Sequence, residues 1–217
     1  MKKLLLLSSG LGALKDFVGG SPSDIKMLFI STAGNPYDDV WWIDKDREVL
    51  EDMGFVITEA DLIKTDAPKL EKLVKDSDIV YVAGGNTFYL LHHIRTSGFD
   101  NIIQEYVNNG GLYAGASAGA LVAGVDIGPI SSMDEPEAAP DLISTEGLGF
   151  VDIIPVPHYD MKDRTEPIDA IRKEYGSSYE IVLMTDDQAV LVEGNNWKLV
   201  ESKRNGLEMK WCKENGL

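Results

Sequence analysis

The stretch GGLYAGASAGALVAG, residues 110–124, consists almost entirely of small side chains and holds one serine, Ser117, between Gly115 and Gly119. Residues 111–115 have the pattern of a short strand, and residues 118–123 that of a starting helix. Gly-x-Ser-x-Gly between a strand and a helix is the pattern of a nucleophile elbow, a turn so sharp that the serine's neighbours must be small. The stretch therefore predicts a nucleophilic serine at a strand end, where free amides of the next helix can stabilise an oxyanion.

Other interpretations of this stretch fit its residues less well. A phosphate-binding P-loop needs a lysine directly after its last glycine, and no lysine follows Gly119 nearby. The glycine spacing also differs from the dinucleotide-binding pattern. A third interpretation is that the small residues let the following helix pack tightly on the sheet. It is compatible with the elbow, because such close packing allows the turn at Ser117 to be sharp.

Strand-like and helix-like segments alternate along most of the chain. A segment rich in Pro, Gly and acidic residues follows Val125 and contains one apolar run, residues 150–156. The alternation predicts parallel βαβ units, and hence an α/β fold with a mostly parallel sheet, helices on both faces and a single domain over residues 1–217. Strand patterns cover residues 3–8, 27–31, 55–61, 78–85, 111–115, 180–184, 189–194 and 197–200, and helical patterns cover 38–53, 68–75, 87–95, 99–108, 118–123 and 163–175.

Composition narrows the class of protein. A formal net charge of -16 over 217 residues argues against a nucleic-acid or anionic-membrane partner, because both need a basic footprint. The single cysteine, Cys212, can form neither an internal disulfide nor a Cys-rich zinc site, so we expect a cytoplasmic protein without a metal. The apolar run of residues 4–7 is too short for a signal peptide, and no segment approaches the roughly 18 apolar residues of a membrane span.

A nucleophilic serine needs a base, and the chain contains three histidines. His92 and His93 are adjacent within a predicted helix, where neighbouring side chains point in different directions. His158 lies in IPVPHYDM, at the end of an apolar run and directly after a proline. The sequence therefore predicts His158 as the base that activates Ser117.

The residues alone leave the acid behind the histidine open. Five carboxylates are candidates because they lie near His158 in the sequence or at a strand end: Asp134, Glu135, Asp160, Asp186 and Asp187. A second glycine-rich strand end, AGGNTF, suits the other half of an oxyanion hole, since Gly84 and Gly85 let the backbone approach a substrate closely. Asn86, which follows them, is expected to bind a ligand, to cap the next helix, or both.

The motifs GGNTFYLL, GASAGA and PHY, together with the proline-rich segment before PHY, resemble the peptidase E family of serine peptidases. That family contains aspartyl dipeptidases and, more distantly, cyanophycinases. The resemblance covers nearly the whole chain and implies a flavodoxin-like fold similar to the class I glutamine amidotransferases. It implies an acyl-enzyme on Ser117, His158 as the base, oxyanion donors at the amides of Gly85 and Ala118, and no cofactor.

The resemblance also bears on the acid and on the substrate. The family's acid near the end of a late strand falls on Asp186, which we favour over Asp134 because a strand end holds a side chain more rigidly than a proline-rich loop. The adjacent Asp187 is the fallback. Aspartyl dipeptidases must bind an acidic side chain, for which Arg164 is the matching cation.

The resulting hypothesis is a serine peptidase that hydrolyses small peptides, in particular Asp-X dipeptides. Two alternatives are an esterase or amidase on the same elbow, and a family member that binds ligands without catalysis. The neighbours Trp41 and Trp42 either lie in a homodimer interface or cover the core, and amphipathic spacing favours the core for at least one of them.

Overall fold

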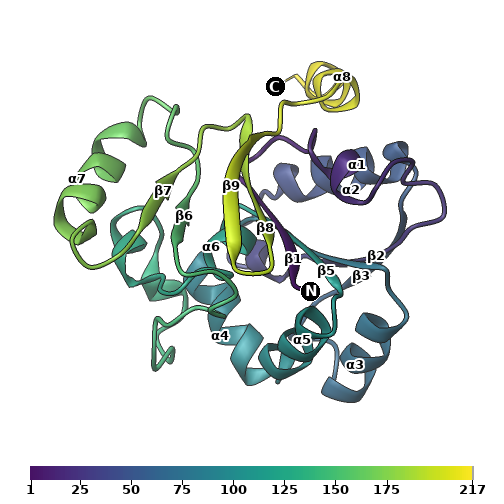
Figure 1. Ribbon diagram of the computed structural model, residues 1–217, viewed down its shortest axis with the longest axis horizontal. Coiled ribbons are helices and arrows are strands. Elements are labelled where there is room, and N and C mark those ends of the chain that lie inside the picture. The colour runs from purple at the N-terminus through teal and green to yellow at the C-terminus, as the bar shows by residue number, and fades with distance from the viewer. Residues whose placement is uncertain (217) are drawn as a thin grey trace.

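A seven-stranded sheet forms the centre of the computed structural model, which describes residues 1–216 (Figure 1). The strand order is β3-β2-β4-β5-β1-β8-β9, and the first five strands of the chain pair in parallel. This arrangement confirms the predicted α/β fold with a mostly parallel sheet. The strands are β1 (Lys3–Leu7), β2 (Lys26–Ile30), β3 (Val56–Ala60), β4 (Ile79–Val82), β5 (Leu112–Ala116), β8 (Gln188–Glu193) and β9 (Asn196–Glu201).

Helices cover both faces of this sheet because its inner strands are apolar on both sides. In β1, Leu4 and Leu6 join one hydrophobic cluster, while Leu5 and Leu7 join the other. The first cluster packs under α3 (Ala67–Lys75), α4 (Thr87–Thr96), α5 (Phe99–Asn108) and α6 (Ala118–Leu121). The second packs under α1 (Leu14–Phe17), α2 (Trp41–Met53) and α8 (Gly206–Glu214), as Figure 1 shows.

The helix ends follow local signals in the sequence. The α2 helix stops at Gly54, whose φ of 107° is the left-handed C-cap that glycine favours. The carboxylate of Asp66 caps α3 by accepting the Lys69 amide at 2.9 Å. At its start α2 is three residues shorter than predicted, because the Asp39 carboxylate instead accepts the Trp41 amide at 3.2 Å in a preceding turn.

The chain after Val125 departs most from a simple parallel α/β pattern. Strands β6 (Ile154–Val156) and β7 (Ile181–Leu183) form a separate two-stranded parallel sheet, and α7 (Thr165–Tyr175) connects them. Strand β8 runs antiparallel to β1, and β9 follows it as a hairpin. The parallel pairing therefore extends over β1 to β5 and over β6 with β7, whereas β8 and β9, which only a two-residue turn separates, are antiparallel.

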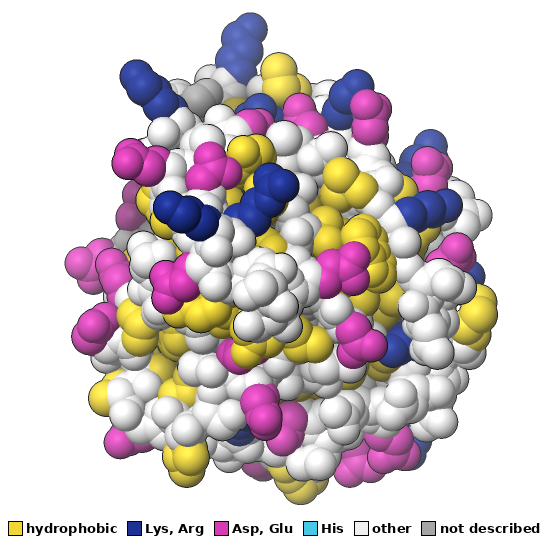
Figure 2. Space-filling model, turned by 60° about the vertical axis from the view of Figure 1, so that its left-hand side comes forward, with side chains coloured by type: hydrophobic (Ala, Val, Ile, Leu, Met, Phe, Trp, Pro, Cys, Tyr) yellow, Lys and Arg dark blue, Asp and Glu magenta, His cyan; other side chains and the backbone are white. Residues whose placement is uncertain are grey.

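On the face shown in Figure 2, acidic and basic side chains are interspersed with hydrophobic ones, so the basic groups form no continuous patch there. Among residues 1–216, no helix combines the length and the apolar character that crossing a bilayer requires.

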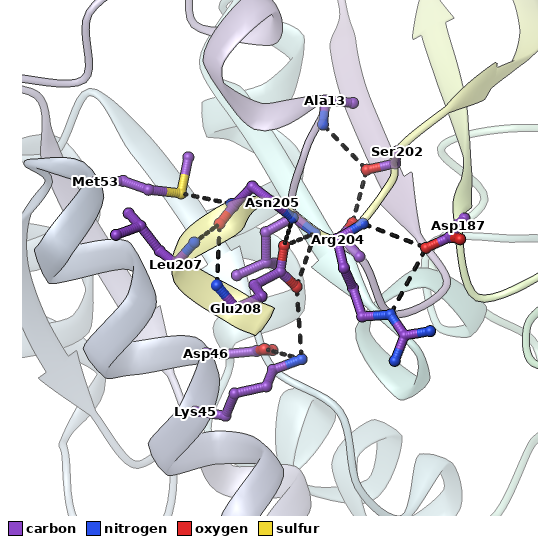
Figure 3. Close-up of polar contacts among 12 residues, drawn as sticks. Ala13, Lys45, Asp46, Met53, Asp187, Ser202, Arg204, Asn205, Leu207 and Glu208 are labelled. Atoms are coloured by element: carbon purple, nitrogen blue, oxygen red, sulfur yellow. Dashed lines mark hydrogen bonds and ion pairs between the residues drawn. The ribbon is translucent and has the colours of Figure 1, made fainter. Parts of the chain in front are cut away.

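A C-terminal helix, α8, is an element that the sequence patterns did not predict. Its fully buried Glu208 accepts the backbone amides of Leu11 at 3.1 Å and Asn205 at 2.9 Å (Figure 3). Lys45 Nζ lies 3.8 Å from Glu208 and 3.1 Å from Asp46. Burial alone would lower the pKa of Lys45, but the two carboxylates outweigh it and raise that pKa, so the lysine stays charged. The buried network thereby joins α8 to α2 and to the loop after β1.

We expect Glu208→Ala to lower the free energy of unfolding by about 3 kcal/mol, because it leaves the buried amide of Leu11 and the part-buried amide of Asn205 unpaired and removes one of the partners of Lys45. Urea unfolding measures the change. The matched control in the same helix is Glu214→Ala, whose ion pair with Lys210 is exposed and should contribute less than about 1 kcal/mol. Equal losses in the two variants would contradict the structural role of Glu208.

Candidate active site

A cavity of about 610 Å³ lies where several strands end, and its lining includes Ser117, His158, Asp186, Gly85 and Arg164. Ser117 follows β5 directly, and the two-glycine segment of Gly85 follows the neighbouring β4. His158 comes two residues after β6, and Asp186 lies between β7 and β8. Parallel strands place their carboxyl ends on one side, which is where ligands bind in α/β folds.

The backbone at Ser117 has the strained geometry of a nucleophile elbow. Its φ of 49° and ψ of -107° are unusual for a residue other than glycine, and it stands at the N-cap position of α6 without a capping hydrogen bond from its side chain. A Cβ at Gly115 would lie 2.2 Å from the Gly119 carbonyl oxygen, and one at Gly119 would lie 2.1 Å from that of Val82. The buried Tyr113 hydroxyl donates to the Gly119 carbonyl at 2.6 Å. The glycines are therefore needed for close approach, as the sequence pattern predicts.

Hydrogen bonds connect the three side chains in a row. Ser117 Oγ lies 3.0 Å from His158 Nε2, and His158 Nδ1 lies 2.7 Å from Asp186 Oδ1. The carboxylate can only accept, which assigns the imidazole proton to Nδ1 and leaves Nε2 free to accept the serine proton. His158 has a φ of 64°, and its own amide donates to the hydroxyl of Ser8 at 2.9 Å. This hydrogen bond holds the backbone of His158 next to the end of β1.

Asp186 is held as an ionised partner of the histidine. Burial alone would raise the pKa of Asp186, but the hydrogen bond and the electrostatic attraction of the His158 ring outweigh burial and lower that pKa below its ordinary value. The positive charges of Arg204 and Lys45 act in the same direction. The Asp186 amide donates to Asp160 Oδ1 at 2.8 Å, so Asp160 supports the acid without touching the ring.

Other carboxylates that the sequence left open have different partners. Asp187 accepts the backbone amide of Arg204 at 3.2 Å, and Figure 3 shows its carboxylate turned to that residue. Asp134 lines the cavity and accepts the Thr87 amide at 2.8 Å, at the start of α4. Among the described carboxylates, Asp186 alone hydrogen-bonds to His158. Its catalytic role stays a prediction.

Two backbone amides beside Ser117 are available as donors. Those of Gly85 and Ala118 donate no hydrogen bond to another residue of the described chain. Gly85 has a φ of 145°, and a Cβ there would lie 2.1 Å from the Ala33 carbonyl oxygen, so only glycine fits. A Cβ at the adjacent Gly84 would lie 3.1 Å from the Ser117 Cβ, which shows how closely the two segments approach.

Asn86 differs from the expectation that it binds a ligand. Its side chain is fully buried, its Oδ1 accepts the Tyr89 amide at 2.8 Å, and its Nδ2 donates to the Glu135 carbonyl at 3.0 Å. It caps α4 and anchors the following loop, and it is absent from the described lining of the cavity. The prediction of helix capping is therefore confirmed, while the side chain does not face the site.

Arg164, by contrast, does line the cavity. One guanidinium nitrogen donates to the Met133 carbonyl at 2.7 Å. No carboxylate of the described chain lies within ion-pair distance of this guanidinium. The arginine therefore reaches the site with its charge uncompensated by a direct partner.

Sequence reasoning missed an aromatic wall of the cavity, formed by Tyr37, Trp41 and Trp42. Trp42 is half-buried against the second core cluster, and its indole Nε1 donates to the Gly84 carbonyl at 3.2 Å. Trp41 keeps 40% of its surface exposed. The signal was the run NPYDDVWW, residues 35–42, which begins four residues after the predicted strand 27–31, in a position where α/β folds place ligand-binding loops.

The sequence model of peptidase family S51 matches residues 4–200 of the chain. The chain belongs to this family. Membership confirms the resemblance to peptidase E, and it makes the S51 protein a peptidase of the serine type. The match spans the elbow, His158, Asp186 and Arg164, so the whole candidate site lies within the region that the family shares.

Several relatives of this S51 protein are similar over most of their length. An uncharacterized peptidase of Pasteurella multocida is 30% identical over 208 residues, which is 95% of this chain and 100% of the relative. Peptidase E of a Nostoc species is 31% identical over 73% of this chain and 66% of its own. A crystal structure of a candidate peptidase E from Listeria monocytogenes superposes with a TM-score of 0.87 at 28% identity, covering 94% of this chain and 100% of the other.

Proposed function

We propose that this S51 peptidase hydrolyses small peptides through an acyl-enzyme on Ser117, with Asp-X dipeptides as its substrates. The observation that carries the proposal is the hydrogen-bonded row from Ser117 through His158 to Asp186 beside two free amides. Such a row is the arrangement that activates a serine for acyl transfer. It favours a peptidase over a family member that only binds ligands, because a binding protein has no need of a base placed on the serine.

In the proposed reaction, Ser117 Oγ attacks the scissile carbonyl carbon while His158 Nε2 takes its proton. The amides of Gly85 and Ala118 stabilise the negative oxygen that forms. His158 then gives the proton to the leaving amine as the C–N bond breaks, and an ester on Ser117 remains. Water attacks this ester with His158 again as the base, which releases the acid and restores the serine. Asp186 stabilises the imidazolium in both halves.

The preference for an N-terminal aspartate is supported by Arg164. A guanidinium binds a carboxylate through two parallel hydrogen bonds, and the charge of Arg164 has no direct carboxylate partner among residues 1–216. Because its Nη1 is tied to the Met133 carbonyl, the guanidinium is oriented before a substrate arrives. An acidic side chain bound there would lie in the same cavity as Ser117.

We expect Arg164→Ala to reduce kcat/KM for Asp-Leu by about 10- to 100-fold, the loss of a charge-assisted hydrogen-bonded pair. The reduction for Asn-Leu should stay within about threefold, since the amide lacks the charge. Steady-state hydrolysis of both dipeptides measures the difference, and the exposed Arg172→Ala in the same helix region serves as the control. An equal loss on both substrates would assign Arg164 to loop support rather than to specificity.

The remaining enzymatic alternative, an esterase or amidase of other specificity, predicts a different substrate profile. A panel of Asp-X and neutral dipeptides beside p-nitrophenyl esters separates the two. Preferential turnover of Asp-X peptides supports the proposal, and turnover of the esters without any dipeptide overturns it.

A further inference from the structure

We infer that Trp42 positions the oxyanion donor of Gly85, a role that rests on the proposed function of the site. The indole Nε1 of Trp42 donates to the carbonyl oxygen of Gly84 at 3.2 Å. This is the sole hydrogen bond that the described residues offer to that carbonyl. Trp42 stands on the first turn of α2, outside the strand ends that carry the reacting side chains.

Peptide geometry connects this contact to the oxyanion hole. The Gly84 carbonyl and the Gly85 N–H belong to one planar, trans peptide unit, so they point in opposite directions. Fixing the carbonyl toward Trp42 therefore fixes the N–H on the opposite side. Gly84 approaches Ser117 closely, so this amide lies beside the nucleophile with no partner in the described chain.

The two-glycine segment needs such an external anchor. Glycines have no side chain to restrict them, and a rotated peptide would turn the donor away from the substrate. The next residue is already held, because the Asn86 amide donates to the Ala33 carbonyl at 2.8 Å. Trp42 holds the Gly84 carbonyl on the other side of Gly85, so the segment is restrained both before and after Gly85.

The indole is itself held in place by aromatic neighbours. The Tyr37 ring packs edge-on against Trp42 at a centroid distance of 5.5 Å and an angle of 79°. The Trp41 ring makes a second edge contact at 6.0 Å and 85°. These contacts leave the Nε1–H directed at one acceptor, which is what a positioning residue requires.

Loss of this hydrogen bond should affect the transition state more than substrate binding, because the oxyanion exists only after attack. We expect Trp42→Phe to lower kcat by about 10-fold with KM changed less than about twofold. The affinity for a peptide boronic acid, which forms a tetrahedral adduct on the serine, should fall by a similar factor. The matched control is Trp211→Phe, which also removes an indole hydrogen bond, here to Glu48 at 2.6 Å and away from the cavity, and should leave kcat unchanged.

A second variant separates the hydrogen bond from packing. Benzothienylalanine at position 42 keeps the shape of the two fused rings and replaces the N–H by sulfur. The positioning role predicts that this variant is as slow as Trp42→Phe, whereas recovery of wild-type kcat would assign the effect to packing and overturn the inference.

The rate of labelling by a fluorophosphonate keeps this inference distinct from the proposed function. Wild-type protein that is not labelled contradicts the proposed function itself. Labelled wild-type protein together with equally fast labelling of both Trp42 variants contradicts only the role of Trp42.

Discussion

Ser117→Ala is expected to reduce kcat/KM for an Asp-X dipeptide by at least about 10⁴-fold, because the acyl-enzyme can no longer form. The residual rate would come from the free amides and from substrate binding alone. The small side chain fits the elbow, so the midpoint of urea unfolding should change little. Steady-state hydrolysis, measured at matched enzyme concentrations, provides the comparison.

The control for this variant is Ser177→Ala, at an exposed turn after α7, which should retain full activity. Retention of more than about 1% of wild-type activity by Ser117→Ala would contradict the nucleophile assignment, provided that both variants are purified in the same way.

Asp186→Asn is expected to lower kcat by about 10³- to 10⁴-fold while the fold stays intact. The amide of asparagine can donate to His158 Nδ1, which favours the tautomer with the proton on Nε2. That tautomer cannot accept the proton of Ser117. The loss should appear in kcat and little in KM, because the acid does not touch the substrate in the proposed scheme.

Asp187→Asn is the matched control, since the change is the same and the position is adjacent. Its carboxylate contacts Arg204 and not the histidine, so we expect an effect within about threefold. A larger loss from Asp187→Asn or from Asp134→Asn than from Asp186→Asn would show that another acid serves the histidine.

Local patterns were sufficient to select the serine and the histidine that the structure places in contact. The elbow depends on glycines that are adjacent in sequence, and close approach explains why Gly115 and Gly119 flank Ser117. His158 followed by elimination because the chain has three histidines and two of them lie side by side in α4. The paired glycine strand ends also indicated Gly85, whose φ of 145° only glycine adopts readily.

The acid required information that a local pattern does not contain. Asp186 and Asp187 are neighbours in sequence. The pairing of β6 with β7 and the hydrogen bond that the Asp186 amide donates to Asp160 determine which of the two faces His158. The residues alone left five candidates. The family resemblance favoured Asp186, and the structure shows that this carboxylate contacts His158.

Long-range contacts also explain what the patterns missed. The role of Trp42 depends on a hydrogen bond across 42 positions of sequence, and the buried ion pair of Lys45 with Glu208 spans most of the chain. The α8 helix itself had a detectable signal, because Asn205 and Glu208 form a capping box with the spacing that such boxes require.

Mass spectrometry of the fluorophosphonate-treated protein tests most directly whether Ser117 is an activated nucleophile. We predict a single covalent adduct on the wild-type chain that maps to Ser117, no adduct on Ser117→Ala, and much slower labelling of Asp186→Asn. Wild-type protein that stays unlabelled, or equal labelling of Ser117→Ala, would contradict the central claim.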